Sequence, residues 1–171
     1  MTVTIAQRGL FYDELRTDVV YQHSPGRTLD IADNTLFSTL TMNPQSLHLD
    51  ADASAATEFG QRLVNSMLTL STLIGLSVGQ LTQATTIANL GFGAVRFPHP
   101  VFAGDTLYAS TSVVHKRLST SWENAGIVEF EHVGRNQHGE TVAIATRTAL
   151  MRVGPVDVDT AQSAADPAGA T

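Results

Sequence analysis

The chain has 171 residues, of which 43% are hydrophobic and 15% are charged, values typical of one soluble globular domain. Its formal net charge of −6 argues against a nucleic-acid partner, because such a partner usually needs a clustered basic face. The sequence contains no cysteine, which excludes disulfide bonds, thiolate metal sites and cysteine nucleophiles.

The N-terminal part of the chain predicts short elements. Residues 1–18 lack the basic-then-apolar pattern of a signal peptide, so we expect a cytoplasmic protein. Residues 19–23 and 27–31 predict two short extended pieces, separated by a Ser-Pro-Gly turn. Asp33 can cap a short helix over residues 34–40, because its carboxylate can accept backbone N–H bonds there.

Two further segments precede the most hydrophobic stretch of the chain. Residues 41–50 predict a turn-like segment, because Pro44 discourages a continued helix. Residues 52–59 predict another short helix, and Gly60 supplies the residue type that commonly ends one.

Residues 65–81 (NSMLTLSTLIGLSVGQL) predict a helix at the centre of the fold. The stretch carries no charge, and its apolar residues point in every helical direction with only small or uncharged polar residues between them. A surface helix would instead show a polar face every 3.6 residues. A membrane span needs about 20 predominantly apolar residues, more than this stretch has. We therefore expect a helix enclosed by a sheet, and no membrane span.

Four long strands follow the helix, rich in Val, Ile, Thr, Phe and Ala. They are expected at residues 85–97, 106–118, 125–136 and 141–153, with a hairpin at the polar Asn-Gln-His-Gly sequence between the last two. This order predicts an α+β fold in which a curved antiparallel sheet wraps a long central helix. We expect one domain over residues 1–154. The small, acidic and Pro/Ala-rich residues 155–171 predict a disordered tail.

Three motifs then carry a specific resemblance, which spans about residues 9–153. NTLFSTLTMNPQSLH (34–48) resembles the F-x-x-L-T-G-D-x-N-P-x-H signature of the MaoC-like (R)-specific enoyl-CoA hydratases. EFGQRLVNSML (58–68) and VRFPHPVFAGDTL (95–107) are similar to two further motifs of that family. The likeness is greatest to its mesaconyl-CoA and itaconyl-CoA hydratase branch. It implies a hot-dog fold and a hydro-lyase that adds water to a short branched or dicarboxylic enoyl-CoA.

The resemblance assigns three catalytic positions. His48 is expected to move protons, because an imidazole can take a proton from water and return it near neutral pH. Asn43 stands where the family has Asp, so it cannot act as an acid or base, but its amide can hold the water. The backbone N–H of Ser66, at the helix start, is the expected oxyanion donor.

Each catalytic assignment has a structural alternative. His48 can be a turn histidine bonded to the backbone, and Asn43 can be an ordinary turn residue before Pro44. Asn65 or Ser66 can equally supply the N-cap of the helix.

Five residues are expected to bind the substrate. Arg62 and Arg96 are the candidates for a substrate carboxylate, which a guanidinium can bind in a bidentate way; contacts with solvated acids or with CoA phosphates are alternatives for both. Asn65, Asn89 and Phe97 are expected to line the same cleft. We expect no metal, because no metal-ligand spacing such as H-E-x-x-H occurs, and no cofactor beyond the coenzyme A of the substrate.

Two other functions remain open from the sequence. A thioesterase usually needs a carboxylate near the helix start, where Glu58 is the only nearby candidate. A non-catalytic acyl-CoA-binding protein is the second alternative, since Asn43 replaces the catalytic Asp. For all three functions we expect a homodimer or larger homo-oligomer, because a single hot-dog sheet leaves one edge uncovered.

Overall fold

The computed structural model of the protein describes residues 5–155. Four long strands and one long helix dominate it, as predicted, with strand ends within one residue of expectation. The predicted disordered tail lies outside the described residues except for Pro155. The elements are β1 (Val20–Gln22), β2 (Arg27–Thr28), α1 (Ile31–Leu40), α2 (Ser46–Leu49), α3 (Ala51–Ala55), α4 (Ser66–Leu81), β3 (Thr86–Arg96), β4 (Thr106–Leu118), β5 (Ala125–Arg135) and β6 (Thr141–Arg152).

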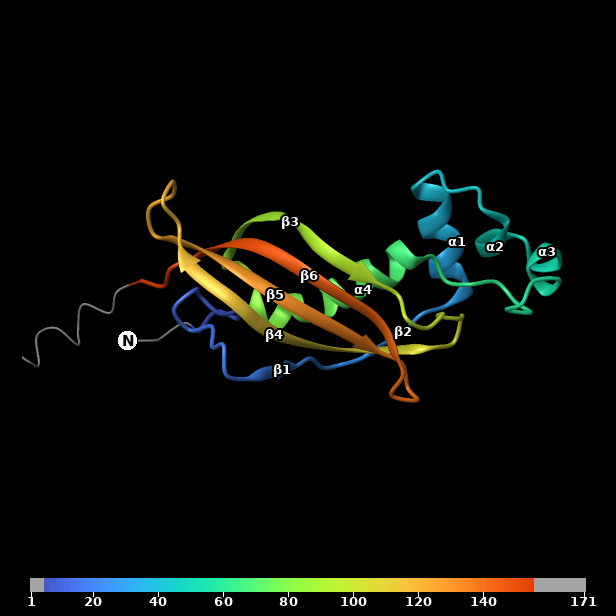
Figure 1. Cartoon of the computed structure of the whole chain (residues 1–171), viewed down its shortest axis with the longest axis horizontal. Helices are drawn as coiled ribbons and strands as arrows, with labels where there is room; N and C mark the ends of the chain where they lie inside the picture. Colours follow the sequence, from blue (N-terminus) through green and yellow to red (C-terminus); the bar gives the residue numbers. More distant parts are fainter. Residues whose placement is uncertain (1–4, 156–171) are drawn as a thin grey trace, which may run out of the picture.

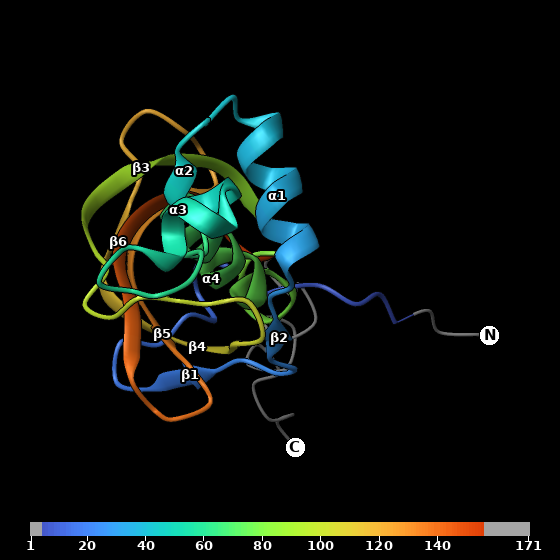
Figure 2. The same cartoon turned by 90° about the vertical axis from the view of Figure 1, so that its right-hand side faces the viewer.

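The strands form one antiparallel sheet in the order β1-β4-β5-β6-β3, with β2 also paired to β4. The sheet curves around α4, which lies along its concave side (Figures 1 and 2). This is the expected α+β architecture, a curved antiparallel sheet around one long helix. No helix in the described part of the chain is both long and apolar enough to cross a membrane.

The sheet covers only one face of α4. Every fourth residue of the helix is buried, from Thr69 through Leu73 and Ser77 to Leu81. The opposite face is exposed and carries only small or apolar residues: Met67, Ser71, Gly75 and Gly79. The expectation that the helix is enclosed on all sides is therefore wrong for a single chain. The exposed face of α4 lacks charged residues, which is why the sequence shows no polar stripe.

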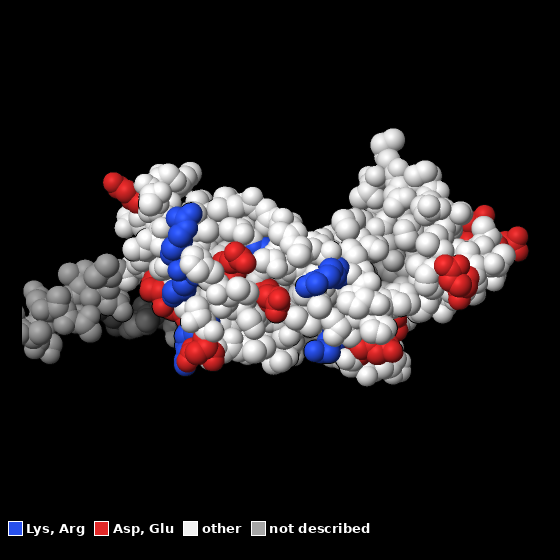
Figure 3. Space-filling view, viewed as in Figure 1, with Lys and Arg blue, Asp and Glu red and all other residues white. Residues whose placement is uncertain are grey.

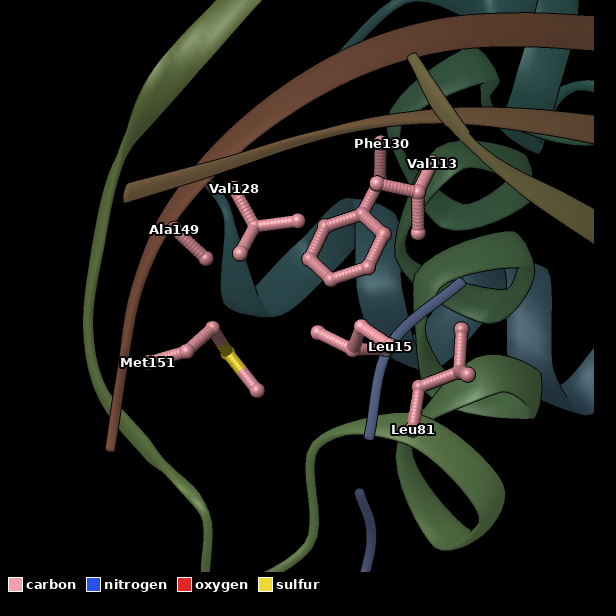
Figure 4. Close-up of a cluster of buried hydrophobic side chains, with 7 residues drawn as sticks. All are labelled: Leu15, Leu81, Val113, Val128, Phe130, Ala149 and Met151. Atoms are coloured by element: carbon pink, nitrogen blue, oxygen red, sulfur yellow. The ribbon is translucent and has the colours of Figure 1, made fainter. Parts of the chain in front are cut away.

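The core fills the space between α4 and the sheet. At the C-terminal end of α4, Leu81 packs with side chains from β4, β5 and β6 and with Leu15 of the N-terminal segment (Figure 4). In the middle of α4, Leu73 packs against Ala109 and Ala143, where small residues on the sheet let the helix approach closely. These clusters fix α4 on the sheet and so fix where its N-terminus points.

Helices α1, α2 and α3 form a lobe beyond the N-terminus of α4 (Figures 1 and 2). The predicted start of α1 was wrong: the helix begins at Ile31, with Asp30 as its N-cap. Asp33 does not cap the helix, because its carboxylate reaches back and accepts the backbone N–H of Asp30 at 2.9 Å. That bond is one half of a capping box, which extends the helix by a turn.

The segment between α1 and α4 also differs from expectation. Residues 46–49, predicted as turn-like, form the single turn of α2. The second short helix covers Ala51–Ala55 rather than residues 52–59. This helix starts at Ala51 because Asp50 is its N-cap. The Asp50 carboxylate accepts the backbone N–H groups of Asp52 and Ala53, both at 3.0 Å. These two short turns hold His48 beside the start of α4.

Candidate active site

The tautomer of His48 is set by one hydrogen bond. The half-buried His48 side chain extends from α2, and its Nδ1 lies 3.0 Å from the backbone carbonyl oxygen of Leu63. A carbonyl can only accept, so Nδ1 carries a proton, and in the neutral ring Nε2 is then the nitrogen that keeps its lone pair. The imidazole is thus held in the form that can take a proton from water. This same contact fulfils the alternative of a backbone-bonded turn histidine, and the two descriptions are compatible.

Asn34 joins the three segments around His48. This fully buried side chain on α1 donates from Nδ2 to the carbonyl oxygens of His48 (3.1 Å) and Leu63 (2.9 Å). Its Oδ1 accepts the backbone N–H of Asn65 at 2.8 Å. Sequence reasoning missed Asn34. Asn34 was the first residue of the predicted helix, where Asn is common, and only the earlier start of α1 at Ile31 puts it inside the helix.

The start of α4 presents the Ser66 amide. Asn65 is the N-cap, and its side-chain Oδ1 accepts the backbone N–H of Met67 at 3.0 Å. Asn65 is buried, and its Nδ2 donates to the hydroxyl of Ser38. Helix geometry leaves the first amide, that of Ser66, without an acceptor within α4. The cap assignment therefore belongs to Asn65, which leaves the Ser66 N–H for a ligand at the positive end of the helix dipole.

A cavity of about 310 Å³ lies at this end of α4. Two of the residues predicted from the sequence, Ser66 and Phe97, line it. His99 also lines it, and sequence reasoning missed this residue although it lies within the VRFPHP motif. Its Nδ1 donates to the carbonyl oxygen of Thr141 at 2.9 Å, which leaves Nε2 as an acceptor. The other lining residues are Phe59, Leu63, Val64, Thr69, Pro98, Pro100, Val101 and Val142.

Asn43 lies outside this cavity, in the turn between α1 and α2. It lines a neighbouring cavity of about 400 Å³ with Ser38, Thr39, Met42, Pro44 and Leu49. Its Oδ1 accepts the backbone N–H of Gln45 at 3.1 Å, which is the structural alternative named from the sequence. Met42, the residue before it, has a φ of 54° in the left-handed region. The family signature has Gly there, the residue that takes this conformation without strain.

The remaining predicted residues are spread along the site and beyond it. Arg62 lines a cavity of about 260 Å³ with residues of α3 and the following loop. Arg96 is exposed and ends β3, directly before Phe97. Neither arginine forms an ion pair among residues 5–155. Asn89 lies near the start of β3, where its Oδ1 accepts from Nε of Arg147, so the structure does not bring it to this cavity.

Acidic side chains predominate on the lobe. The view in Figure 3 shows Asp and Glu, and no Lys or Arg, over the part of the lobe that faces the reader. Within the described residues, no group of three or more His, Cys, Asp and Glu side chains has a geometry that could hold a metal. The cavity thus offers the His99 ring and the start of α4 with Ser66, whereas His48 lines none of the cavities described and is tied to this one through its hydrogen bond to Leu63.

Comparisons with known proteins agree with this arrangement. A family model described as the MaoC like domain matches residues 14–150. Mesaconyl-CoA hydratase of Cereibacter sphaeroides is 26% identical over 144 residues, 84% of this chain and 41% of that protein. β-Methylmalyl-CoA dehydratase of Chloroflexus aurantiacus is 28% identical over 150 residues, 84% of this chain and 40% of that protein. The chain thus spans about two fifths of the length of these relatives.

The fold has a close counterpart among solved structures. A Mycobacterium tuberculosis protein, described as having a double hot-dog fold, matches with a TM-score of 0.78 and 27% identity. The match covers 86% of this chain and 46% of that one. With the family model matching most of the chain, and the helix and sheet arranged as in this solved structure, the protein belongs to the MaoC-like domain family and has a hot-dog fold.

Proposed function

We propose that this protein is an enoyl-CoA hydratase, a hydro-lyase that adds water to a short branched or dicarboxylic enoyl-CoA. The observation that carries the proposal is His48, whose Nδ1–H is bonded to the Leu63 carbonyl so that Nε2 is a free base near the start of α4. The names of the mesaconyl-CoA hydratase and β-methylmalyl-CoA dehydratase relatives support the reaction class.

In the proposed reaction, Nε2 of His48 removes a proton from water while the oxygen attacks Cβ of the enoyl thioester. The π electrons move toward the thioester carbonyl, and negative charge develops on its oxygen. The Ser66 N–H, at the positive end of the α4 dipole, stabilises that charge. The imidazolium of His48 then returns the proton to Cα, which completes the addition of one water and regenerates the neutral base.

Asn43 suits a substrate that carries its own carboxylate. Its Oδ1 is used by Gln45, which leaves Nδ2 to donate to the attacking water or to the substrate. An aspartate in its place would repel a mesaconyl or itaconyl carboxylate by ~1–4 kcal/mol at surface-like dielectric constants.

The other proposed substrate-binding residues have different roles. Arg62 or Arg96 would supply the positive charge that matches the substrate carboxylate, and Phe97 would supply an apolar wall. Asn65 contributes through the helix cap, whereas Asn89, which is bonded to Arg147 away from this cavity, is not part of the proposed site.

A second copy of the chain would complete the assembly. Strand β3 ends the sheet, and its neighbour β6 covers only one of its edges. Leu90 and Phe92 on β3 are 50% and 43% exposed, and the adjoining face of α4 is uncharged. An unpaired edge with exposed apolar residues is a surface that proteins normally cover. We therefore propose a homodimer formed along β3.

The proposal is tested with purified protein and three thioesters: mesaconyl-CoA, itaconyl-CoA and crotonyl-CoA. We expect the enoyl-thioester absorbance to fall with a dicarboxylic substrate and no free thiol to be released. Thiol release would instead identify a thioesterase. Binding of a thioester without loss of either signal would identify a non-catalytic acyl-CoA-binding protein.

A further inference from the structure

Asn34 is hydrogen-bonded to the segments that carry His48 and the start of α4, although it lines none of the cavities described. It lies in the middle of α1 with 0% of its side chain exposed. Its amide makes three hydrogen bonds, to His48 in α2, Leu63 in the loop and Asn65 at the start of α4. Buried polar groups in proteins are normally satisfied, and here each bond ends on a backbone atom next to a proposed functional group.

The carbonyl oxygen of Leu63 links Asn34 to the base. It accepts both the Nδ2–H of Asn34 at 2.9 Å and the Nδ1–H of His48 at 3.0 Å. A carbonyl oxygen has two lone pairs, so these two donors fill it. The direction of this carbonyl determines which ring nitrogen of His48 carries the proton. Asn34 holds the carbonyl in that direction, and its bond to the His48 carbonyl holds the α2 turn as well.

The other end of the same amide fixes the oxyanion donor. Oδ1 of Asn34 accepts the N–H of Asn65, the residue directly before Ser66. One rigid side chain thus sets the distance between His48 and the first turn of α4. Only a carboxamide serves this role, since an ionised carboxylate cannot donate to the two carbonyls and an aliphatic side chain can neither donate nor accept.

We propose that Asn34 is a positioning residue of the active site, which fixes the His48 tautomer and the separation between the base and the Ser66 amide. The inference rests on the proposed hydratase function for its kinetic consequence, while its structural part concerns His48 alone. Misplacement of reacting groups by about 1 Å can cost roughly 100-fold in rate.

The test variant is Asn34→Asp, which keeps the shape and the acceptor for Asn65 but loses the amide donor. Asn136→Asp is the matched control. Asn136 is also buried, and its Oδ1 accepts the N–H groups of His138 and Glu140 in the β5–β6 hairpin, with no hydrogen bond to His48, Leu63 or Asn65. Both variants lose part of a buried network, so both are expected to melt at lower temperature.

The kinetic readout separates positioning from stability. We expect Asn34→Asp to lower kcat about 100-fold with KM changed less than about threefold, because Asn34 lines none of the cavities described. Asn136→Asp is expected to keep the wild-type kcat. The kcat of Asn34→Asp relative to that of the wild type at the same pH should recover partly as the pH falls, because the introduced carboxyl group, once protonated, can again donate one hydrogen bond. Equal kcat in both variants would overturn the proposal.

A spectroscopic readout tests the inference even if the wild-type protein hydrates nothing. Nitrogen-15 NMR of the histidine rings should show His48 as a single Nδ1–H tautomer in the wild type and in Asn136→Asp. Asn34→Asp should show a mixture of both tautomers. An unchanged His48 tautomer in Asn34→Asp contradicts the positioning role, whereas a wild type without turnover contradicts only the hydratase.

Discussion

At the scale of single residues, the site depends on backbone carbonyls and amides held by a few side chains. The tautomer of His48 is set by the Leu63 carbonyl, and the start of α4 by the cap at Asn65. The motifs placed Ser66 at the start of α4, where the structure puts it on the cavity, while the catalytic roles of His48 and Ser66 stay predictions. Asn34 and His99 could not be predicted from the sequence, since their roles depend on hydrogen bonds to residues distant in the chain.

Asn43 provides a prediction about substrate charge. Asn43→Asp should lower kcat/KM for mesaconyl-CoA, because the new carboxylate repels the substrate carboxylate by ~1–4 kcal/mol. Crotonyl-CoA, which has no carboxylate, is the control substrate and should be affected much less. Steady-state kinetics with both thioesters measures the difference. An equal or higher kcat/KM for mesaconyl-CoA in the variant would remove the electrostatic reason for Asn43.

At the scale of elements, the packing of α4 on the sheet determines where the candidate site lies. The four strands and the helix were predictable, because hydrophobic residues and turn sequences mark them plainly. The extent to which α4 is buried was not predictable. A stripe of Ser and Gly is equally compatible with an enclosed helix and with one open face, and only the position of the sheet distinguishes them.

Leu73 anchors α4 on the sheet and is 1% exposed. Its Cδ1 lies 3.4 Å from the position that a side-chain Cβ would take on Gly134, so the helix and β5 are in close contact. Leu73→Ala should lower the free energy of unfolding by about 2–5 kcal/mol, through lost burial and a residual cavity. Ser71→Ala, on the exposed face of α4, should change it by less than about 0.5 kcal/mol. Urea denaturation measures both, and equal effects would contradict the packing described.

The sheet also contains a buried polar chain. The hydroxyl of Thr111 is hydrogen-bonded to Nε2 of His23 at 2.7 Å and to Nδ1 of His132 at 2.8 Å. Burial, together with the charges of Arg147 and His23, lowers the pKa of His132 from 6.5 to about 3, and burial is the largest of these causes. Burial also lowers the pKa of His23. Both histidines are therefore held neutral inside the folded protein.

The pH dependence of stability follows from that shift. Below pH 6.5 the unfolded chain binds a proton at His132 that the folded chain does not bind until about pH 3. Stability should therefore be constant with respect to this group above pH 6.5. It should fall by about 1.4 kcal/mol per unit as the pH decreases toward 3.

Denaturant titrations of the wild type and His132→Asn between pH 4 and 8 test this sign. The variant lacks the titrating group, so its stability should fall less steeply below about pH 6.5, even if it is less stable at pH 8. His138→Gln removes an exposed histidine and serves as the control. Parallel curves for the wild type and His132→Asn would contradict the assignment.

At the scale of the whole molecule, a single chain covers the candidate-site end of α4 but leaves one edge of the sheet and one face of the helix uncovered. The lobe of α1, α2 and α3 covers one end of α4, while β3 and the uncharged face of α4 remain open. The sequence indicated a second copy because a sheet has edges, but it could not show which edge is apolar. In the structure the edge strand β3 exposes Leu90 and Phe92, while the opposite edge strand β1 exposes only Val20 among its large hydrophobic residues.

Light scattering tests the proposed dimer directly. The wild-type chain of 18.2 kDa should elute with twice that mass, and Phe92→Glu should shift it toward the monomer, because a charge would be buried against the partner. Val114→Glu on β4, a similarly exposed site, should leave the mass unchanged. A wild-type monomer, or a dimer that only Val114→Glu disrupts, would contradict the β3 interface.

The most direct measurement of the central claim compares the hydration of mesaconyl-CoA by the wild type and by His48→Ala. Absorbance of the enoyl thioester should fall with the wild type and at least about 100-fold more slowly with His48→Ala, the range expected when a general base is removed. Equal melting temperatures would show that both proteins are folded. A variant as fast as the wild type would show that His48 is not the base, and the hydratase mechanism proposed for this site would fail.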